Sequence, residues 1–237
     1  MNILLVNDDG INSDRLLFTK NVLKNYGKVL TVAPSLEQSG MSSSITIGDL
    51  KYQQVHISPD DEMYSVEGTP VDCITVALLA LDFKPDLVVS GVNKGFNLGI
   101  DTIYSGTVGA AINAKYYGLN AIALSADPTD FQLVKDNLKD VIEYLIKNNI
   151  YDGEFVVNIN FPDKLNNEIK DYQYTTVYGL KYELDKKISQ NETQFNLSLN
   201  RKQPLSYLPK DSDLYAVRTG NLSISKIKPY YKIYQKG

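Results

Sequence analysis

The sequence contains very few of the residues that carry thiol, imidazole or zinc chemistry. Among its 237 residues there is one cysteine, Cys73, one histidine, His56, and no tryptophan. A single cysteine excludes an intrachain disulfide and a zinc site built on cysteines. The apolar neighbours of Cys73 favour a buried packing role over a catalytic one. His56 lies in an alternating polar run away from the other candidate residues, so a histidine phosphatase mechanism is not expected.

Long apolar runs and an excess of positive charge are also missing. No run approaches the ~20 apolar residues that span a bilayer. The first residues lead straight into a strand-like run without the basic and apolar regions of a signal peptide, so we expect a cytoplasmic protein with no membrane partner. The formal net charge of −4 argues against general nucleic-acid binding, because such proteins usually present a broad basic surface.

Buried strand patterns alternate with helix patterns over the first two thirds of the chain. Continuous apolar runs typical of strands in a parallel sheet occur at residues 3–6, 28–33, 85–90, 121–125 and 155–160. Thr69-Pro70 is typical of a helix start, because a capping hydroxyl precedes a proline at the first helical position. The pattern predicts an α/β fold with a doubly wound, mostly parallel sheet over residues 1–163, and a β-hairpin excursion around residues 44–66.

The pattern changes from about Lys164. Helical periodicity fades, and alternating stretches appear at residues 172–184, 194–199 and 214–217. They predict a smaller, β-rich C-terminal extension over residues 164–237. Long hairpins without a core of their own often pack against another subunit, so we expect a homodimer or a larger homo-oligomer.

Two adjacent carboxylates follow the first predicted strand. Asp8 and Asp9 come directly after the apolar run Ile3–Val6 and precede Gly10. Open α/β sheets bind their ligands at the carboxyl ends of their strands. Neighbouring like charges repel unless a positive group lies near them, and a hard divalent cation with oxygen ligands provides one. An ordinary polar turn is the alternative interpretation, because Asn, Asp and Gly favour turns.

Two further loops are predicted at the same edge of the sheet. Ser39 follows the second strand, and Asn93 and Asn97 follow the strand that ends at Ser90. A doubly wound sheet would bring these side chains close to the acid pair. The resulting oxygen-rich set suits Mg²⁺, Mn²⁺ or Ca²⁺ and is poor for zinc.

A candidate phosphate site begins the next helix. Ser105, Gly106 and Thr107 offer two hydroxyls and an open backbone at a helix N-terminus, where free N–H groups and the positive end of the dipole face an anion. Lys94 would add a positive charge. A plain helix cap is the alternative interpretation of the same residues. A divalent metal beside a phosphate cradle is the recurring arrangement for phosphoryl transfer or hydrolysis, which predicts a phosphomonoesterase.

Five motifs occur in a fixed order within residues 1–162: Asn7–Gly10, Gln38–Gly40, Gly68–Cys73, Ser90–Gly99 and Tyr104–Thr107. Together they resemble the stationary-phase survival protein SurE family of metal-dependent nucleotidases. The resemblance implies a Rossmann-like N-terminal domain and a C-terminal β extension exchanged between subunits of a dimer or tetramer. It also implies hydrolysis of nucleoside 5′-monophosphates and 3′-monophosphates.

The resemblance also implies roles for individual residues. One divalent metal ion per subunit would be held by Asp8, Asp9, Ser39 and Asn93. The phosphate pocket would be lined by Asn97, Ser105, Gly106 and Thr107. The C-terminal motif departs from the family pattern: a Gly-Tyr-Val-Ser-hydroxyl-Pro-Leu-like ending is replaced by residues 220–229, Gly-Asn-Leu-Ser-Ile-Ser-Lys-Ile-Lys-Pro. That difference leaves subunit contacts and base preference open.

The expected mechanism uses Asp8 or Asp9 to orient or deprotonate water, with a covalent aspartyl-phosphate as the lesser option. Two other functions remain as alternatives. A phospho-receiver-like module also places adjacent acids after its first strand, but it needs a phosphoacceptor aspartate at the end of a central strand, and none is present here. A non-catalytic nucleotide-binding module has no distinguishing mark in the sequence. Release of inorganic phosphate separates the three.

Overall fold

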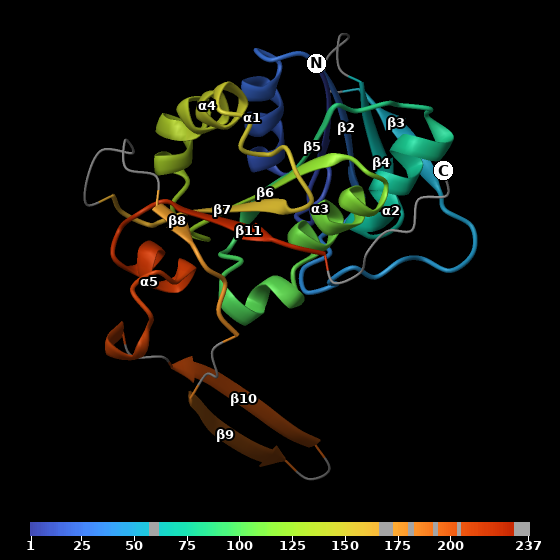
Figure 1. Ribbon diagram of the computed structural model, residues 1–237. Coiled ribbons are helices and arrows are strands. Elements are labelled where there is room, and N and C mark those ends of the chain that lie inside the picture. Colours follow the sequence, from blue (N-terminus) through green and yellow to red (C-terminus); the bar gives the residue numbers. More distant parts are fainter. Residues whose placement is uncertain (57–61, 166–172, 180–182, 192–193, 203–204, 230–237) are drawn as a thin grey trace.

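A nine-stranded sheet forms the centre of the protein (Figure 1). The computed structural model describes residues 1–56, 62–165, 173–179, 183–191, 194–202 and 205–229. In spatial order the strands are β3 (Tyr52–Val55), β4 (Met63–Val66), β2 (Lys28–Pro34), β1 (Asn2–Val6), β5 (Leu87–Lys94), β6 (Asn120–Ala126), β7 (Val156–Phe161), β11 (Ser223–Ile227) and β8 (Gln173–Thr175). β3–β4 and β7–β11 pair antiparallel, and the other neighbours pair parallel. The predicted α/β class is therefore confirmed.

Helices cover both faces of this sheet (Figure 1). α1 (Asp14–Leu23) and α4 (Gln132–Lys147) lie on one face, and α2 (Pro70–Thr75) and α3 (Gly106–Tyr116) lie on the other. Successive side chains of a strand point to opposite faces. Leu5 accordingly packs in the core cluster under α1 and α4, whereas Leu4 packs in the cluster under α2 and α3. Burial on both faces explains why the strands are continuous apolar runs.

The predicted helix start at Thr69 is confirmed by a capping box. The Thr69 hydroxyl accepts a hydrogen bond from the Asp72 N–H, and the Asp72 carboxylate accepts one from the Thr69 N–H. Pro70 occupies the first helical position, and the chain continues beyond α2 as the π-helix Val76–Ala80. Ser13 also stands at the predicted N-cap of α1, but its side chain makes no capping hydrogen bond.

Replacing Thr69 with alanine is expected to lower the free energy of unfolding by about 1 kcal/mol, because the Asp72 N–H loses its partner at the N-terminus of α2. For a chain of this size that corresponds to a fall in melting temperature of about 2–4 °C. Thermal unfolding followed by circular dichroism measures it. Thr69→Ser keeps the hydroxyl and is expected to melt close to the original protein; an equal loss in both variants would contradict the capping explanation.

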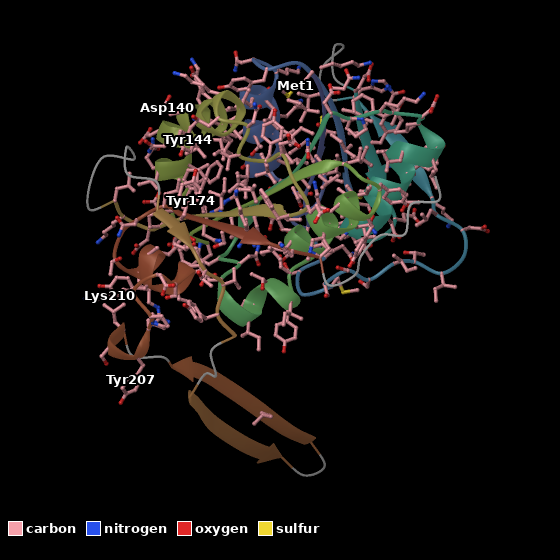
Figure 2. All side chains as sticks on the ribbon, in the orientation of Figure 1. Met1, Asp140, Tyr144, Tyr174, Tyr207 and Lys210 are labelled. Atoms are coloured by element: carbon pink, nitrogen blue, oxygen red, sulfur yellow. The ribbon has the colours of Figure 1, made fainter. Side chains whose placement is uncertain are left out.

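The C-terminal segment contributes to the main sheet. β11 pairs antiparallel with β7 and parallel with β8. The Tyr144 hydroxyl of α4 lies 2.9 Å from the Tyr174 hydroxyl of β8, which ties the last strand of the sheet to that helix (Figure 2). Residues 214–217, predicted as an alternating stretch, instead lie in helix α5 (Asp213–Arg218). The Ser212 side chain caps that helix by accepting from the Tyr215 N–H, and a four-residue alternation is too short to prevail over this cap.

A second, two-stranded sheet projects from the body (Figure 1). β9 (Glu183–Asn191) and β10 (Gln194–Lys202) pair antiparallel along their full length. Five segments of the predicted extension lie outside the described residues: 166–172, 180–182, 192–193, 203–204 and 230–237. None of the described helices combines the length and the apolar character needed to cross a membrane.

The predicted hairpin excursion forms one edge of the main sheet. β4 pairs parallel with β2, and β3 pairs antiparallel with β4 on the outside. Residues 45–47, predicted as part of the excursion, are not in a strand, and residues 57–61 lie outside the described part. The connection between β2 and β3 contacts the acid pair at Gln38, whose N–H donates to the Asp8 carbonyl.

Candidate active site

The acid pair lies at the carboxyl end of β1, as predicted. Alternation along the strand continues past Val6 and turns Asp8 toward the face covered by α3, where its carboxylate accepts a 2.6 Å hydrogen bond from the Thr107 hydroxyl. The Asp8 carbonyl accepts from the Gln38 N–H at 2.7 Å, and the Ile11 N–H donates to the Pro34 carbonyl at 2.8 Å. The loop after β2, which contains Ser39, is thus attached to the acid pair through its backbone.

Burial sets the charge state of Asp8. The residue is 3% exposed, and this burial, opposed by the hydrogen bond from Thr107 and supported by the neighbouring charge of Asp9, raises the pKa of its carboxyl to about 6. Gly106, the first residue of α3, leaves room for this arrangement. A Cβ at position 106 would lie 3.2 Å from both the Cβ and Oδ2 of Asp8 and from the Cγ of Pro70. The N-terminus of α3 therefore meets a buried carboxylate at close range.

Asp9 faces different partners. Burial raises the pKa of its carboxyl, and a 3.1 Å hydrogen bond from the Lys94 N–H, together with the charge of Arg15, acts in the opposite direction. The charge of Glu37 raises the pKa further. Lys94 thus acts on Asp9 through its main-chain N–H and through the charge of its exposed side chain, which also lowers the pKa of Asp9.

Of the two remaining predicted metal ligands, Ser39 lies in the loop after β2 and Asn93 lies near the end of β5. The Ser39 hydroxyl donates to Glu37 Oε1 at 2.7 Å. Asn93 is 9% exposed, and its Nδ2 donates to the Gly95 carbonyl at 2.9 Å, which leaves the side-chain oxygen as a candidate ligand. In the described part of the chain, no cluster of three or more His, Cys, Asp and Glu side chains is suited to a metal. The available donors are two carboxylates, an amide oxygen and a hydroxyl, and they fit a hard divalent cation.

The start of α3 combines a helix cap with groups that could bind an anion. The Ser105 hydroxyl accepts from the Val108 N–H at 3.1 Å, so the predicted alternative, a capping role, is realised. The single hydroxyl hydrogen of Thr107 is used by Asp8. Because accepting leaves its own hydrogen available, the Ser105 hydroxyl can still donate to an anion, beside the Gly106 backbone and the favourable end of an eleven-residue helix.

Asn97 is placed by a dense set of hydrogen bonds. It is 5% exposed, and its Nδ2 donates to Ser125 Oγ at 2.7 Å. Two residues on, the Gly99 N–H donates to Asp213 Oδ2 at 2.7 Å, where a 3₁₀ helix, η2 (Gly99–Ile103), begins. Asp213 is fully buried, and that burial raises the pKa of its carboxyl to about 6. η2 leads directly to Ser105, so the predicted phosphate residues form one continuous segment.

Comparison with known proteins identifies the family of this chain. A family described as Survival protein SurE matches residues 3–183. A 5′-nucleotidase SurE of Stenotrophomonas maltophilia is 36% identical over 247 residues, which cover 99% of this chain and 92% of that protein. A 5′-nucleotidase SurE of Legionella pneumophila is 32% identical over 249 residues, covering 99% and 94%. The chain belongs to the SurE family.

A solved SurE structure supports the fold in three dimensions. The crystal structure of the Sure protein from Aquifex aeolicus matches this chain with a TM-score of 0.83 at 29% identity, covering 98% of this chain and 95% of that one. The predicted SurE resemblance is therefore confirmed at the level of family and fold, and the site assignments remain predictions.

Two side chains at this SurE site carried no signal in the sequence. The Arg15 guanidinium donates to the carbonyls of Asn93 at 3.1 Å and Asp127 at 2.7 Å, and it lies 4.7 Å from the centre of the Phe131 ring. It joins α1 to the end of β5 and to the residue that follows β6. Glu37 places a further carboxylate near Asp9. Neither residue has a local motif, since each reaches the site only through the fold.

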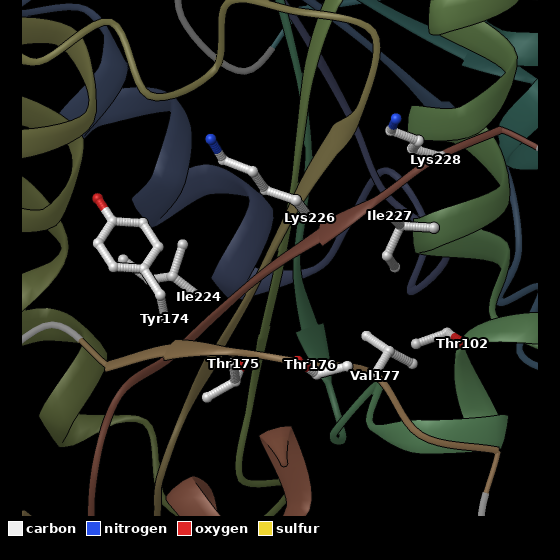
Figure 3. A pocket seen from close by; sticks show the side chains of 9 residues that line it. All are labelled: Thr102, Tyr174, Thr175, Thr176, Val177, Ile224, Lys226, Ile227 and Lys228. Atoms are coloured by element: carbon white, nitrogen blue, oxygen red, sulfur yellow. The ribbon is translucent and has the colours of Figure 1, made fainter. Parts of the chain in front are cut away.

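Figure 3 shows a pocket of the protein and the nine residues that line it. It has a volume of about 480 Å³, and β8, β11 and η2 contribute its walls, including Thr102, Tyr174 and Lys226. It contains none of the nine predicted site residues. Thr102 belongs to the segment that links Asn97 to Ser105, and it is the lining residue nearest in sequence to the candidate phosphate residues.

Proposed function

We propose that this chain is a metal-dependent 5′-nucleotidase that hydrolyses nucleoside 5′-monophosphates to nucleoside and phosphate. The observation that carries the proposal is the 2.6 Å hydrogen bond between Thr107 and Asp8, which brings the acid pair of β1 to the N-terminus of α3. The names of the SurE relatives, 5′-nucleotidase, support the same activity. Activity on nucleoside 3′-monophosphates is part of the proposal through the family resemblance.

The chain's own residues divide the work of hydrolysis. The start of α3 binds the phosphoryl oxygens through the Gly106 N–H and the Ser105 hydroxyl. The Asn97 amide and the charge of Lys94 help to stabilise the charge that develops on these oxygens. The acid pair orients a water molecule and accepts its proton while the water oxygen forms a bond to phosphorus. The ester P–O bond breaks, and its electron pair leaves with the nucleoside oxygen, which takes up a proton.

A divalent cation fits beside these groups. Asp8, Asp9, Ser39 and Asn93 would hold it, and Mg²⁺ or Mn²⁺ suits this donor set, as does Ca²⁺. When bound, the ion supplies Lewis-acid polarisation of the phosphoryl group. The raised pKa values of Asp8 and Asp9 show that their ionised forms are disfavoured in the protein alone. A bound cation would stabilise the two ionised carboxylates.

The proposal includes a homodimer or tetramer in the cytoplasm. The β9–β10 hairpin projects away from the body, and Leu197 on it is 61% exposed. A two-stranded hairpin is marginally stable by itself, and a partner subunit would supply the missing contacts. No general nucleic-acid partner is proposed.

Phosphate release from a panel of nucleoside 5′- and 3′-monophosphates tests the function. We expect turnover with added Mg²⁺ or Mn²⁺ and at least a tenfold loss with a chelator. A stoichiometric transfer of label to the protein without turnover would instead indicate a receiver-like module. Nucleotide binding without any phosphate release, with every metal tried, would indicate a binding module and overturn the proposal.

A further inference from the structure

Two buried asparagines of β7 hold the main chain of Asn97. The Asn97 N–H donates to Asn160 Oδ1 at 2.8 Å, and Asn160 Nδ2 donates back to the Asn97 carbonyl at 3.1 Å. Asn158 Nδ2 donates to the same carbonyl at 2.9 Å. Both asparagines have no exposed surface. Their side chains therefore pair with residue 97 in the way that the backbone of a neighbouring strand would.

The two asparagine amides are buried, which indicates that their hydrogen bonds are the reason for polar residues at these positions. β7 is an interior strand, and its alternation places Val157 and Ile159 in the core under α1 and α4. Asn158 and Asn160 point to the opposite face, where an apolar residue would avoid the cost of burying an amide. Asn158 Oδ1 is buried and has no partner in the part of the chain that the structure describes. Asn158 therefore carries the cost of a buried, unpaired amide oxygen. We infer that the hydrogen bond from its Nδ2 to the Asn97 carbonyl is the reason for an asparagine at this position.

Only a primary amide offers both a donor and an acceptor in this shape. Asn160 uses both with a single residue, Asn97, because its oxygen accepts and its nitrogen donates. Leucine has the same branching at Cγ, but it would leave the Asn97 N–H unpaired in a buried position and the Asn97 carbonyl with Asn158 Nδ2 alone, which is costly. Aspartate would keep the acceptor and lose the donor.

We propose that Asn158 and Asn160 are positioning residues for phosphate binding, which rests on the proposed role of Asn97. Their hydrogen bonds fix the main chain at residue 97, and Ser125 Oγ fixes one hydrogen of its side-chain amide. The second amide hydrogen is left to point at a phosphoryl oxygen. The pair does not touch Asp8 or Asp9, so its effect falls on the phosphate and leaves the metal ligands in place.

Binding of inorganic phosphate to the Mn²⁺-loaded protein, measured by calorimetry, tests this assignment. We expect Asn160→Leu to weaken phosphate binding about tenfold and Asn158→Leu about threefold, because the first removes two hydrogen bonds and the second removes one. Affinity for Mn²⁺ should change less than twofold in both. In turnover assays, KM should rise more than kcat falls, for every nucleotide in the panel alike.

Thr31→Val is the matched control, since Thr31 Oγ1 is buried in β2 and has no hydrogen-bond partner within the described ranges. It should leave both affinities unchanged. Unchanged phosphate affinity in Asn160→Leu, or a parallel loss of Mn²⁺ affinity, would overturn the assignment. Asn158→Leu keeps the test available if Asn160→Leu does not fold. Absence of turnover in the original protein would refute the proposed nucleotidase activity. The role of the asparagine pair is tested separately, by comparing the phosphate affinities of the original protein, Asn158→Leu and Asn160→Leu.

Discussion

Asp8→Asn is expected to lower metal-dependent phosphate release by about 1,000-fold or more while making the metal-free protein more stable at pH 8. The activity falls because the change removes a proposed metal ligand and half of the acid pair that orients and deprotonates water. The structure should survive, because the asparagine Oδ1 can still accept the 2.6 Å hydrogen bond from Thr107. Phosphate release measures the first effect, and thermal unfolding with a chelator measures the second.

The expected gain in stability follows from the raised pKa of Asp8. Its pKa is about 6 in the folded protein against a reference of 3.8, so the folded state holds a proton more tightly than the unfolded state. The contribution to stability is complete below pH 3.8 and is lost as pH rises through about 6. Removing the carboxylate removes that loss, worth roughly 2–3 kcal/mol at pH 8 and close to nothing at pH 4. We expect a melting temperature higher by about 5 °C at pH 8.

Asp14→Asn provides the control for both measurements. Asp14 is an exposed carboxylate at the start of α1, outside the candidate site. It should keep full activity and show no pH-dependent gain in stability. If Asp8→Asn kept full metal-dependent turnover, the assignment of the acid pair would be wrong. If its melting temperature relative to the original protein were lower at pH 8 than at pH 4, the pKa of Asp8 would be lowered by folding, and the raised pKa would be contradicted.

Thr107→Val is expected to lower phosphate release at pH 7 by about 10- to 100-fold. The change keeps the shape of the side chain and removes the hydroxyl that donates to Asp8 at 2.6 Å. That hydrogen bond lowers the pKa of Asp8, so without it the pKa rises above about 6 and less of the carboxylate is ionised at neutral pH. The loss of alignment adds to the loss of charge.

The pH–rate profile at a fixed, subsaturating Mn²⁺ concentration measures this effect. We expect the acid limb to move to higher pH by about one unit or more, since a hydrogen bond to a charged group is worth ~1.5–3 kcal/mol. The deficit should narrow toward pH 9. Thr107→Ser keeps the donor and should retain the original profile. A uniform loss of activity at every pH would show that Thr107 acts on something other than the ionisation of Asp8.

The elements that the sequence predicts correctly are those with a local physical signature. Apolar runs identify β1, β2, β5, β6 and β7, and Thr69-Pro70 identifies the start of α2. The joint position of Asp8 and Asp9 at a strand end follows from where Val6 ends its run. Ser105–Thr107 begins α3 as expected. In each case neighbouring residues alone decide the structure, so the pattern is sufficient.

The parts that it does not predict depend on contacts between distant segments. Asn158 and Asn160 belong to a strand whose apolar residues predict a core strand. No local pattern indicates that the two amides bind Asn97, more than 60 positions away. Arg15 reaches Asn93 and Asp127 only because α1 packs over the ends of β5 and β6. Residues 214–217 alternate like a strand, yet the cap at Ser212 makes them a helix.

The position of β11 between β7 and β8 has a consequence for synthesis on the ribosome. β8 emerges well before β11, its described neighbour in the sheet, so it cannot take its place until Ser223–Ile227 have left the exit tunnel. Asp213, which holds the Gly99 N–H, also emerges in this late stretch. A nascent chain can therefore complete the sheet from β1 to β7 while the segment after Asn97 still lacks its final support. The segment after Asn97 gains this support only once Asp213 has emerged.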